Sequence, residues 1–169
     1  METRPTIKLT LSPRDKFVEW ASRVVLAAVW ILVSVNYTSL PDTIPTHYNL
    51  AGTPDAYGYK GIIWTLPLLG SLLLGILSIL NQHPESFNYY GEVTPHNAAR
   101  QYAAATRTLR YIQLAVVTMF GAIAYQTILI AKGQHIGAWG WAMSAIAIAI
   151  VARIGWHIYT SSQLQKTDS

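Results

Sequence analysis

Five residues that could bind a ligand or take part in acid–base chemistry lie close together in one segment, residues 38–60. They combine an imidazole, an amide, a glycine, a carboxylate and an ammonium group: His47, Asn49, Gly52, Asp55 and Lys60. Side chains of these types can recognise a polar ligand by hydrogen bonds and charge. The sequence therefore predicts that a binding site, if the chain has one, lies in this segment.

A divalent metal is one ligand that this segment could hold. Neutral imidazole and carboxylate together suit zinc, so His47 and Asp55 are the metal candidates, with Asp42 and His135 as further possible ligands. The HExxH spacing of zinc enzymes is absent. The alternative is that His47 and Asp55 form hydrogen bonds inside a self-packed loop and that Lys60 neutralises Asp55. An acid–base pair of Asp55 with Lys60 lacks a nucleophile, so no catalytic residue is assigned.

The turn chemistry of the same segment favours an ordered loop. Pro41 and Pro45 restrict the backbone to extended conformations, and Ala51-Gly52 and Thr53-Pro54-Asp55 are typical of successive tight turns. Loops with specified turns on a rigid scaffold often carry function. Loop 38–60 is therefore the strongest candidate for a functional surface.

The scaffold is predicted to be a bundle of membrane-spanning helices. Of the 169 residues, 51% are hydrophobic and 12% are charged, against roughly 25% charged in a soluble domain, and the mean hydropathy is +0.27. Four apolar segments can each cross about 30 Å of hydrocarbon as a helix. We expect an all-α, single-domain membrane protein, residues 1–169, with spans at about 17–37, 61–81, 109–131 and 136–159.

The distribution of Lys and Arg predicts the orientation of these spans. Ten of the twelve Lys and Arg residues fall on the side that holds both termini, and Lys60 and Lys132 fall on the other. The positive-inside rule places the richer side in the cytoplasm, so we expect a multi-pass protein of the cell membrane with both termini inside and loop 38–60 outside. Attraction to anionic lipid accounts for the net charge of +4, and no nucleic-acid partner is implied.

A small strand pair is expected on the cytoplasmic side. Residues 6–11 alternate between apolar and polar side chains, and so do parts of residues 87–93. Because the charge distribution puts both segments on one side, we expect them to pair as two strands.

The residues of the loop resemble the signature of a bacterial membrane family of unknown function, which also forms the N-terminal module of SdpI-like immunity proteins. The matching positions are Pro41, Ile44, Pro45, His47, Asn49, Gly52, Asp55, Gly58 and Lys60, with a second match over residues 83–102. The immunity proteins protect a producing cell from a secreted, membrane-active toxin peptide. The resemblance thus implies a membrane module of the same topology; the immunity proteins, whose ligand is a peptide, continue into further spans and a second module.

Several classes of function are disfavoured by missing residues. The chain has no cysteine, which excludes thiolate metal sites and a cysteine nucleophile. No Asp or Glu falls in the middle of a predicted span, where proton-coupled carriers and pumps need one. P-loop and nucleophile-elbow motifs are also absent. The sequence does not identify an enzyme.

Three functional hypotheses remain. The first is a binding or interaction protein, immunity-like or signalling, that recognises a peptide, lipid or protein through the loop. The second is a metal-dependent enzyme or metal carrier at the outer face, with a divalent metal as its only cofactor. The third is a structural subunit of a membrane complex, since the Ser71-x-x-x-Gly75 and Ala145-x-x-x-Ala149 pairs permit close helix contact, within the chain or in an oligomer.

Overall fold

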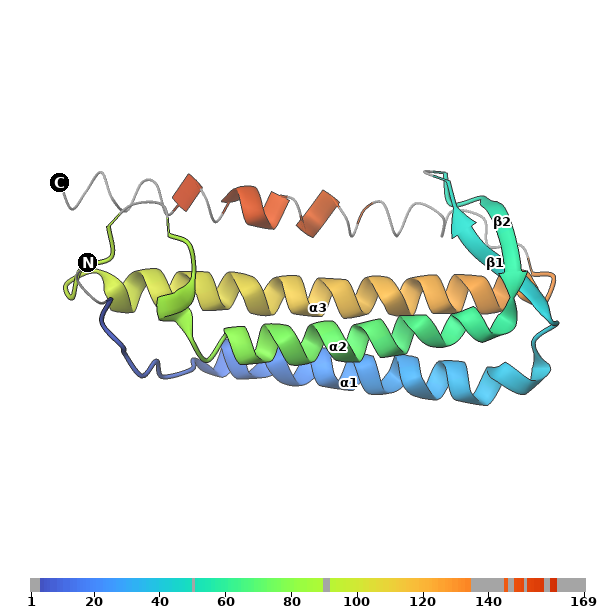
Figure 1. Ribbon diagram of the computed structural model, residues 1–169, viewed down its shortest axis with the longest axis horizontal. Coiled ribbons are helices and arrows are strands. Elements are labelled where there is room, and N and C mark those ends of the chain that lie inside the picture. Colours follow the sequence, from blue (N-terminus) through green and yellow to red (C-terminus); the bar gives the residue numbers. More distant parts are fainter. Residues whose placement is uncertain are drawn as a thin grey trace.

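The computed structural model describes residues 4–49, 51–89 and 92–134, together with 145, 148–150, 152–156 and 159–160. Three long helices and one β-hairpin make up most of this part of the chain (Figure 1). The elements, with η for a 3-10 helix, are α1 (Pro13–Asn36), η1 (Tyr37–Ser39), β1 (Thr43–Tyr48), β2 (Pro54–Tyr59), η2 (Lys60–Trp64), α2 (Thr65–Leu80), η3 (Pro84–Ser86) and α3 (Ala98–Ala131).

Helix α1 begins at a capping box. The Ser12 hydroxyl accepts a hydrogen bond from the backbone N–H of Asp15, and the Asp15 carboxylate accepts one from the backbone N–H of Ser12, both at 3.2 Å. Pro13 occupies the first turn, where its missing N–H costs nothing. The 24 residues of α1 extend about 36 Å, enough to cross a bilayer.

Helices α1, α2 and α3 lie side by side, and α3 packs against both of the others (Figure 1). Within the described residues, three segments are long and apolar enough to cross a membrane: Pro13–Ser39, Lys60–Leu80 and Ala98–Ala131. These contain the predicted spans 17–37 and 109–131, and all of the predicted span 61–81 except its last residue. Large apolar side chains on their surfaces are exposed, for example Val24 and Leu72, as is expected of surfaces that contact lipid. The protein is a multi-pass membrane protein.

The predicted fourth span, residues 136–159, lies largely outside the described residues. Its described fragments, residues 145, 148–150, 152–156 and 159, are helical. They run alongside α3 (Figure 1), and the Arg153 guanidinium lies 5.3 Å from the centre of the Tyr111 ring on α3. Because most of residues 136–159 lie outside the described residues, a fourth span is a proposal.

Loop 38–60 is ordered, and it is the place where two strands pair. Strands β1 and β2 form an antiparallel hairpin in which Ile44 lies opposite Gly58 and Pro45 opposite Tyr57, with a register shift around His47. The hairpin lies at the end of the bundle where α1 ends and α2 begins (Figure 1). We call this end the hairpin end and the opposite one, where α1 begins, the polar end.

The predicted strand pair between residues 6–11 and 87–93 is not formed, because no described residue of either segment lies in a strand. The chain just before residues 6–11 does reach the start of residues 87–93, but through a side chain. Arg4 donates hydrogen bonds to the carbonyl oxygens of Glu85 (3.1 Å) and Phe87 (2.6 Å). The hydroxyl of Tyr102 on α3 donates to the carbonyl of Pro5. Of these carbonyl groups, that of Phe87 lies in a predicted strand, and it is occupied by Arg4.

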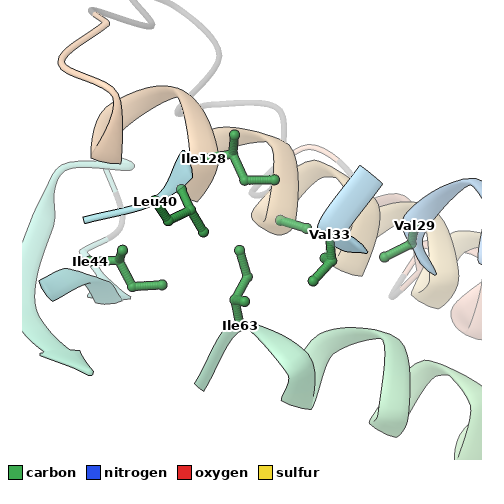
Figure 2. Close-up of a cluster of buried hydrophobic side chains, with 7 residues drawn as sticks. Val29, Val33, Leu40, Ile44, Ile63 and Ile128 are labelled. Atoms are coloured by element: carbon green, nitrogen blue, oxygen red, sulfur yellow. The ribbon is translucent and has the colours of Figure 1, made fainter. Parts of the chain in front are cut away.

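A hydrophobic cluster joins the hairpin to the helices (Figure 2). Its buried members come from α1, the hairpin, η2 and α3, and are Val29, Val33, Leu40, Ile44, Ile63, Ala124 and Ile128. Ile44 on β1 is completely buried among them. Burial of a side chain of this size contributes roughly 1.5–3 kcal/mol, so the hairpin is held to the bundle by apolar packing.

Candidate functional site

The turn of the hairpin is built by two of the predicted site residues. The Asn49 side-chain oxygen accepts hydrogen bonds from the backbone N–H groups of Ala51 (2.9 Å) and Thr53 (3.0 Å). Gly52 has a φ of 76°, a left-handed conformation that favours glycine. Asn49 and Gly52 therefore shape the turn, and their own polar groups are largely used within it.

Helix α3 anchors the tip of the hairpin by polar contacts as well. Gln126 donates a buried hydrogen bond of 2.7 Å to the carbonyl oxygen of Gly52. The hydroxyl groups of Tyr48 and Thr127 are also hydrogen-bonded, at 2.7 Å. Burial raises the pKa of Tyr48, so its phenol stays protonated in this contact. Sequence reasoning missed Gln126 and Thr127, although adjacent polar residues near the end of an apolar span were a usable indication.

His47 and Asp55 are brought together across the hairpin. The His47 Nδ1 atom lies 2.5 Å from an Asp55 carboxylate oxygen. Both side chains are open to the surroundings, with exposed fractions of 69% for His47 and 44% for Asp55. His47 and Asp55 are thus in contact, and the partner of Asp55 is His47 rather than Lys60.

Lys60 instead contacts residues at the base of the hairpin. Its ammonium group lies 3.1 Å from the Asp42 carboxylate and 3.2 Å from the carbonyl oxygen of Leu40, and 5.6 Å from the centre of the Tyr37 ring. The Lys60 side chain is only 18% exposed. Lys60 thus holds the chain where it leaves α1 and enters α2, away from the His47–Asp55 pair.

Exposed residues of β2 lie near His47. Tyr57 and Tyr59 point to the same side of the strand because side chains alternate, and they are 60% and 67% exposed; Asp55 lies where the register of the hairpin shifts and contacts His47. The Tyr37 side chain raises the pKa of Tyr59. We call these four residues, His47, Asp55, Tyr57 and Tyr59, the hairpin face.

The hairpin face can bind by stacking, hydrogen bonding and charge. For metal binding, it supplies two ligands, His47 and Asp55. No group of three or more His, Asp or Glu residues that could hold a metal occurs among the described residues. The fourth metal candidate, His135, lies outside the residues that the structure describes.

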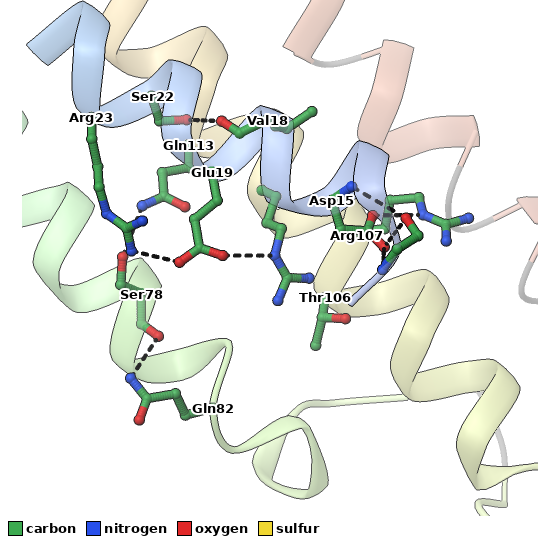
Figure 3. A network of polar contacts seen from close by, with 12 residues as sticks. Asp15, Val18, Glu19, Ser22, Arg23, Ser78, Gln82, Thr106, Arg107 and Gln113 are labelled. Carbon is green, nitrogen blue, oxygen red and sulfur yellow. Dashed lines mark hydrogen bonds and ion pairs between the residues drawn. The ribbon is translucent and has the colours of Figure 1, made fainter. Parts of the chain in front are cut away.

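A second polar cluster lies at the other end of the bundle (Figure 3). Arg107 Nε lies 3.0 Å from Asp15, and Glu19 pairs with Arg23 at 2.5 Å. The second carboxylate oxygen of Glu19 faces Arg110 at 3.7 Å. Sequence reasoning did not pair these charges. The spacing was informative, because residues three or four apart share one face of a helix.

The hairpin lies in a segment of the chain that matches a protein-family model. Residues 24–70 match the model of a family described as a domain of unknown function, DUF1648. This stretch includes the second half of α1, the whole hairpin and the start of α2.

One similar protein is an uncharacterized protein from the archaeon Archaeoglobus fulgidus. It is 27% identical over 73 residues, which cover 38% of this chain and 40% of that protein. No solved structure matches this chain. The chain is thus a multi-pass membrane protein that contains a segment similar to DUF1648, and the hairpin face lies within that segment.

Proposed function

We propose that the protein is a binding protein and that the hairpin face recognises an extended polypeptide. The observation that carries the proposal is that two exposed tyrosines and an oriented His47–Asp55 pair stand on a hairpin whose other parts are fixed by buried contacts. Exposed aromatic side chains on a rigid support are typical of recognition surfaces, because little conformational entropy is lost when they bind.

The position of β2 supports an extended ligand. The sheet has two strands, and β1 is the strand that packs against α3. β2 therefore has an edge that can accept another strand, so main-chain hydrogen bonds would supply affinity while Tyr57, Tyr59 and Asp55 select side chains. The resemblance of residues 41–60 to the module of peptide-toxin immunity proteins agrees with a peptide ligand.

The proposal includes an orientation, in which the hairpin faces the outside of the cell and both termini lie in the cytoplasm. Lys60 and Lys132 are at the hairpin end, whereas Arg4, Lys8 and Arg14 are among the cations of the polar end. This asymmetry follows the positive-inside rule. A secreted peptide would then reach the hairpin face without crossing the membrane.

The test is the native mass of the protein extracted in mild detergent from its own membrane. We expect the wild type to carry a polypeptide, and Asp55→Ala and His47→Ala to lose it while they accumulate to the same level. Lys8→Ala, which removes an exposed cation far from the hairpin, serves as control and should retain the polypeptide.

Other results of the native-mass measurement would contradict the proposal. An excess mass of one zinc ion that disappears in His47→Ala would favour a metal protein. A defined complex with further membrane proteins that persists in both variants would favour a structural subunit. A wild-type protein that carries no polypeptide under conditions that preserve its bound lipid would contradict the proposal.

A further inference from the structure

A small polar cavity lies between the three helices at the polar end. It has a volume of about 150 Å³ and is lined by residues of α1, of α3 and of the segment where α2 ends: Leu11, Glu19, Arg23, Ser78, Asn81, Gln82, Arg110 and Gln113. It is separate from the hairpin face, which is at the opposite end of the bundle. The volume is enough for several water molecules, and therefore for one tetrahedral oxyanion.

Three buried polar atoms of residues that line this cavity lack a hydrogen-bond partner within the described structure. They are one donor, Arg110 Nε, and two acceptors, Asn81 Oδ1 and Gln113 Oε1. The Arg110 and Gln113 residues are 6% and 2% exposed. An unpaired buried polar group costs about 1–3 kcal/mol, and more when it is charged. The cavity thus offers unused hydrogen-bonding capacity of both kinds.

The amide nitrogen of Gln113 is already engaged, and the charged groups of the lining leave the cavity positively charged. Gln113 Nε2 donates to Ser78 Oγ (3.0 Å) and to the Leu74 carbonyl (3.1 Å), which fixes its amide so that Oε1 is the unpaired end. Glu19 is the single carboxylate in the lining, against the guanidinium groups of Arg23 and Arg110. Glu19 pairs with Arg23 at 2.5 Å and lies 3.7 Å from Arg110 Nε, beyond hydrogen-bond distance, so the two guanidinium groups leave a formal excess of one positive charge.

We infer that this cavity binds a phosphate group that carries, or adjoins, a hydroxyl group. A phosphate oxygen would accept from Arg110 Nε, and a hydroxyl would donate to one of the two amide oxygens, Asn81 Oδ1 or Gln113 Oε1. A halide or a carboxylate would satisfy the arginine but would leave both amide oxygens unpaired. Two sources have this chemistry: inorganic phosphate, and the glycerol-phosphate headgroup of an anionic lipid. α2 ends at Leu80, beside the cavity.

The experiment uses the full chain and separates the two sources. In mild detergent, the thermal midpoint is measured with inorganic phosphate and with chloride at equal ionic strength. In nanodiscs, the same midpoint is measured with phosphatidylglycerol titrated into phosphatidylcholine. We expect one of the two phosphate probes to raise the midpoint in a saturable manner. Phosphatidylglycerol alone would identify a lipid site, and inorganic phosphate a soluble-anion site.

A matched pair of variants localises the effect. Arg110→Gln removes the guanidinium donor that lacks a hydrogen bond, and we expect the apparent affinity for the active probe to fall at least about tenfold, as for loss of a charged hydrogen bond. Arg14→Gln removes an exposed cation at the same end of the bundle and should leave the affinity unchanged. An equal loss in both variants would indicate general attraction of anions and would overturn the inference.

Asn81→Asp covers the case in which Arg110→Gln does not fold. This nearly isosteric change places a carboxylate in the cavity that can pair with Arg110. We expect a higher midpoint without any probe and no response to the phosphate probe. A wild type that responds to neither probe, or an Asn81→Asp variant that responds as the wild type does, would overturn the inference.

Discussion

At the scale of single residues, the hairpin shows that the predicted site residues divide into two roles. Asn49, Gly52 and Lys60 build and hold the hairpin, since their polar groups or backbone are used in the turn and at its base. His47 and Asp55 are exposed and paired with each other. Substitutions in the first set should therefore change stability, and substitutions in the second set should change binding.

Gly52→Ala tests the first role. A side chain at a φ of 76° costs about 1–2 kcal/mol, so we expect the free energy of unfolding to fall by this amount, measured by reversible SDS titration in mixed micelles. Gly75→Ala is the control, because Gly75 lies inside α2 and an added Cβ meets no atom within 4 Å. Its stability should be unchanged or up to about 1 kcal/mol higher. Equal losses in both variants would disprove a special role for the Gly52 conformation.

At the scale of the elements, one buried hydrogen bond ties the hairpin tip to α3. Gln126→Ala leaves the Gly52 carbonyl without its donor, at a cost of about 1–3 kcal/mol to the docking of the hairpin. We expect faster amide hydrogen exchange over residues 43–59 and unchanged exchange over the middle of α1 and α3. Gln134→Ala, which alters an exposed side chain just beyond α3, should leave both regions unchanged. Unchanged exchange over residues 43–59 in Gln126→Ala would show that this hydrogen bond does not hold the hairpin to α3.

The elements also show which parts of the fold the sequence could predict. The three spans follow from runs of apolar residues long enough to cross the bilayer, and the ordered loop follows from its turn residues. The predicted position of the strand pair was wrong. Pro45 and Pro54 disfavour strands, so the sequence did not indicate strands in loop 38–60. Both are tolerated here, since each strand of a two-stranded sheet is an edge and Pro54 begins β2.

The polar cluster could not be predicted because its contacts depend on how the helices are rotated about their axes. Sequence spacing groups Asp15 with Glu19 and Arg107 with Arg110, but it does not say that the two groups face each other. The same holds for Gln126, whose partner Gly52 is 74 positions away in the chain. Distant pairings of this kind need the packed structure.

At the scale of the whole molecule, charge asymmetry predicts the orientation in the membrane. Because the chain has no cysteine, single cysteines can be introduced without background. We expect Tyr57→Cys to react with a membrane-impermeant maleimide in intact cells. Arg14→Cys should react only after the membrane is permeabilised. The reverse pattern would place the hairpin in the cytoplasm and remove an extracellular peptide as its ligand.

The central claim is that the hairpin face contacts a polypeptide, and a photo-crosslinking amino acid at position 57 in intact cells tests it most directly. Position 31 is the control, because Ile31 is an exposed side chain of α1 on a surface expected to meet lipid. We predict one polypeptide adduct at position 57, lost when Asp55→Ala is added, and lipid adducts alone at position 31. Lipid adducts alone at both positions would show that Tyr57 lies in the membrane interface, and would contradict the claim.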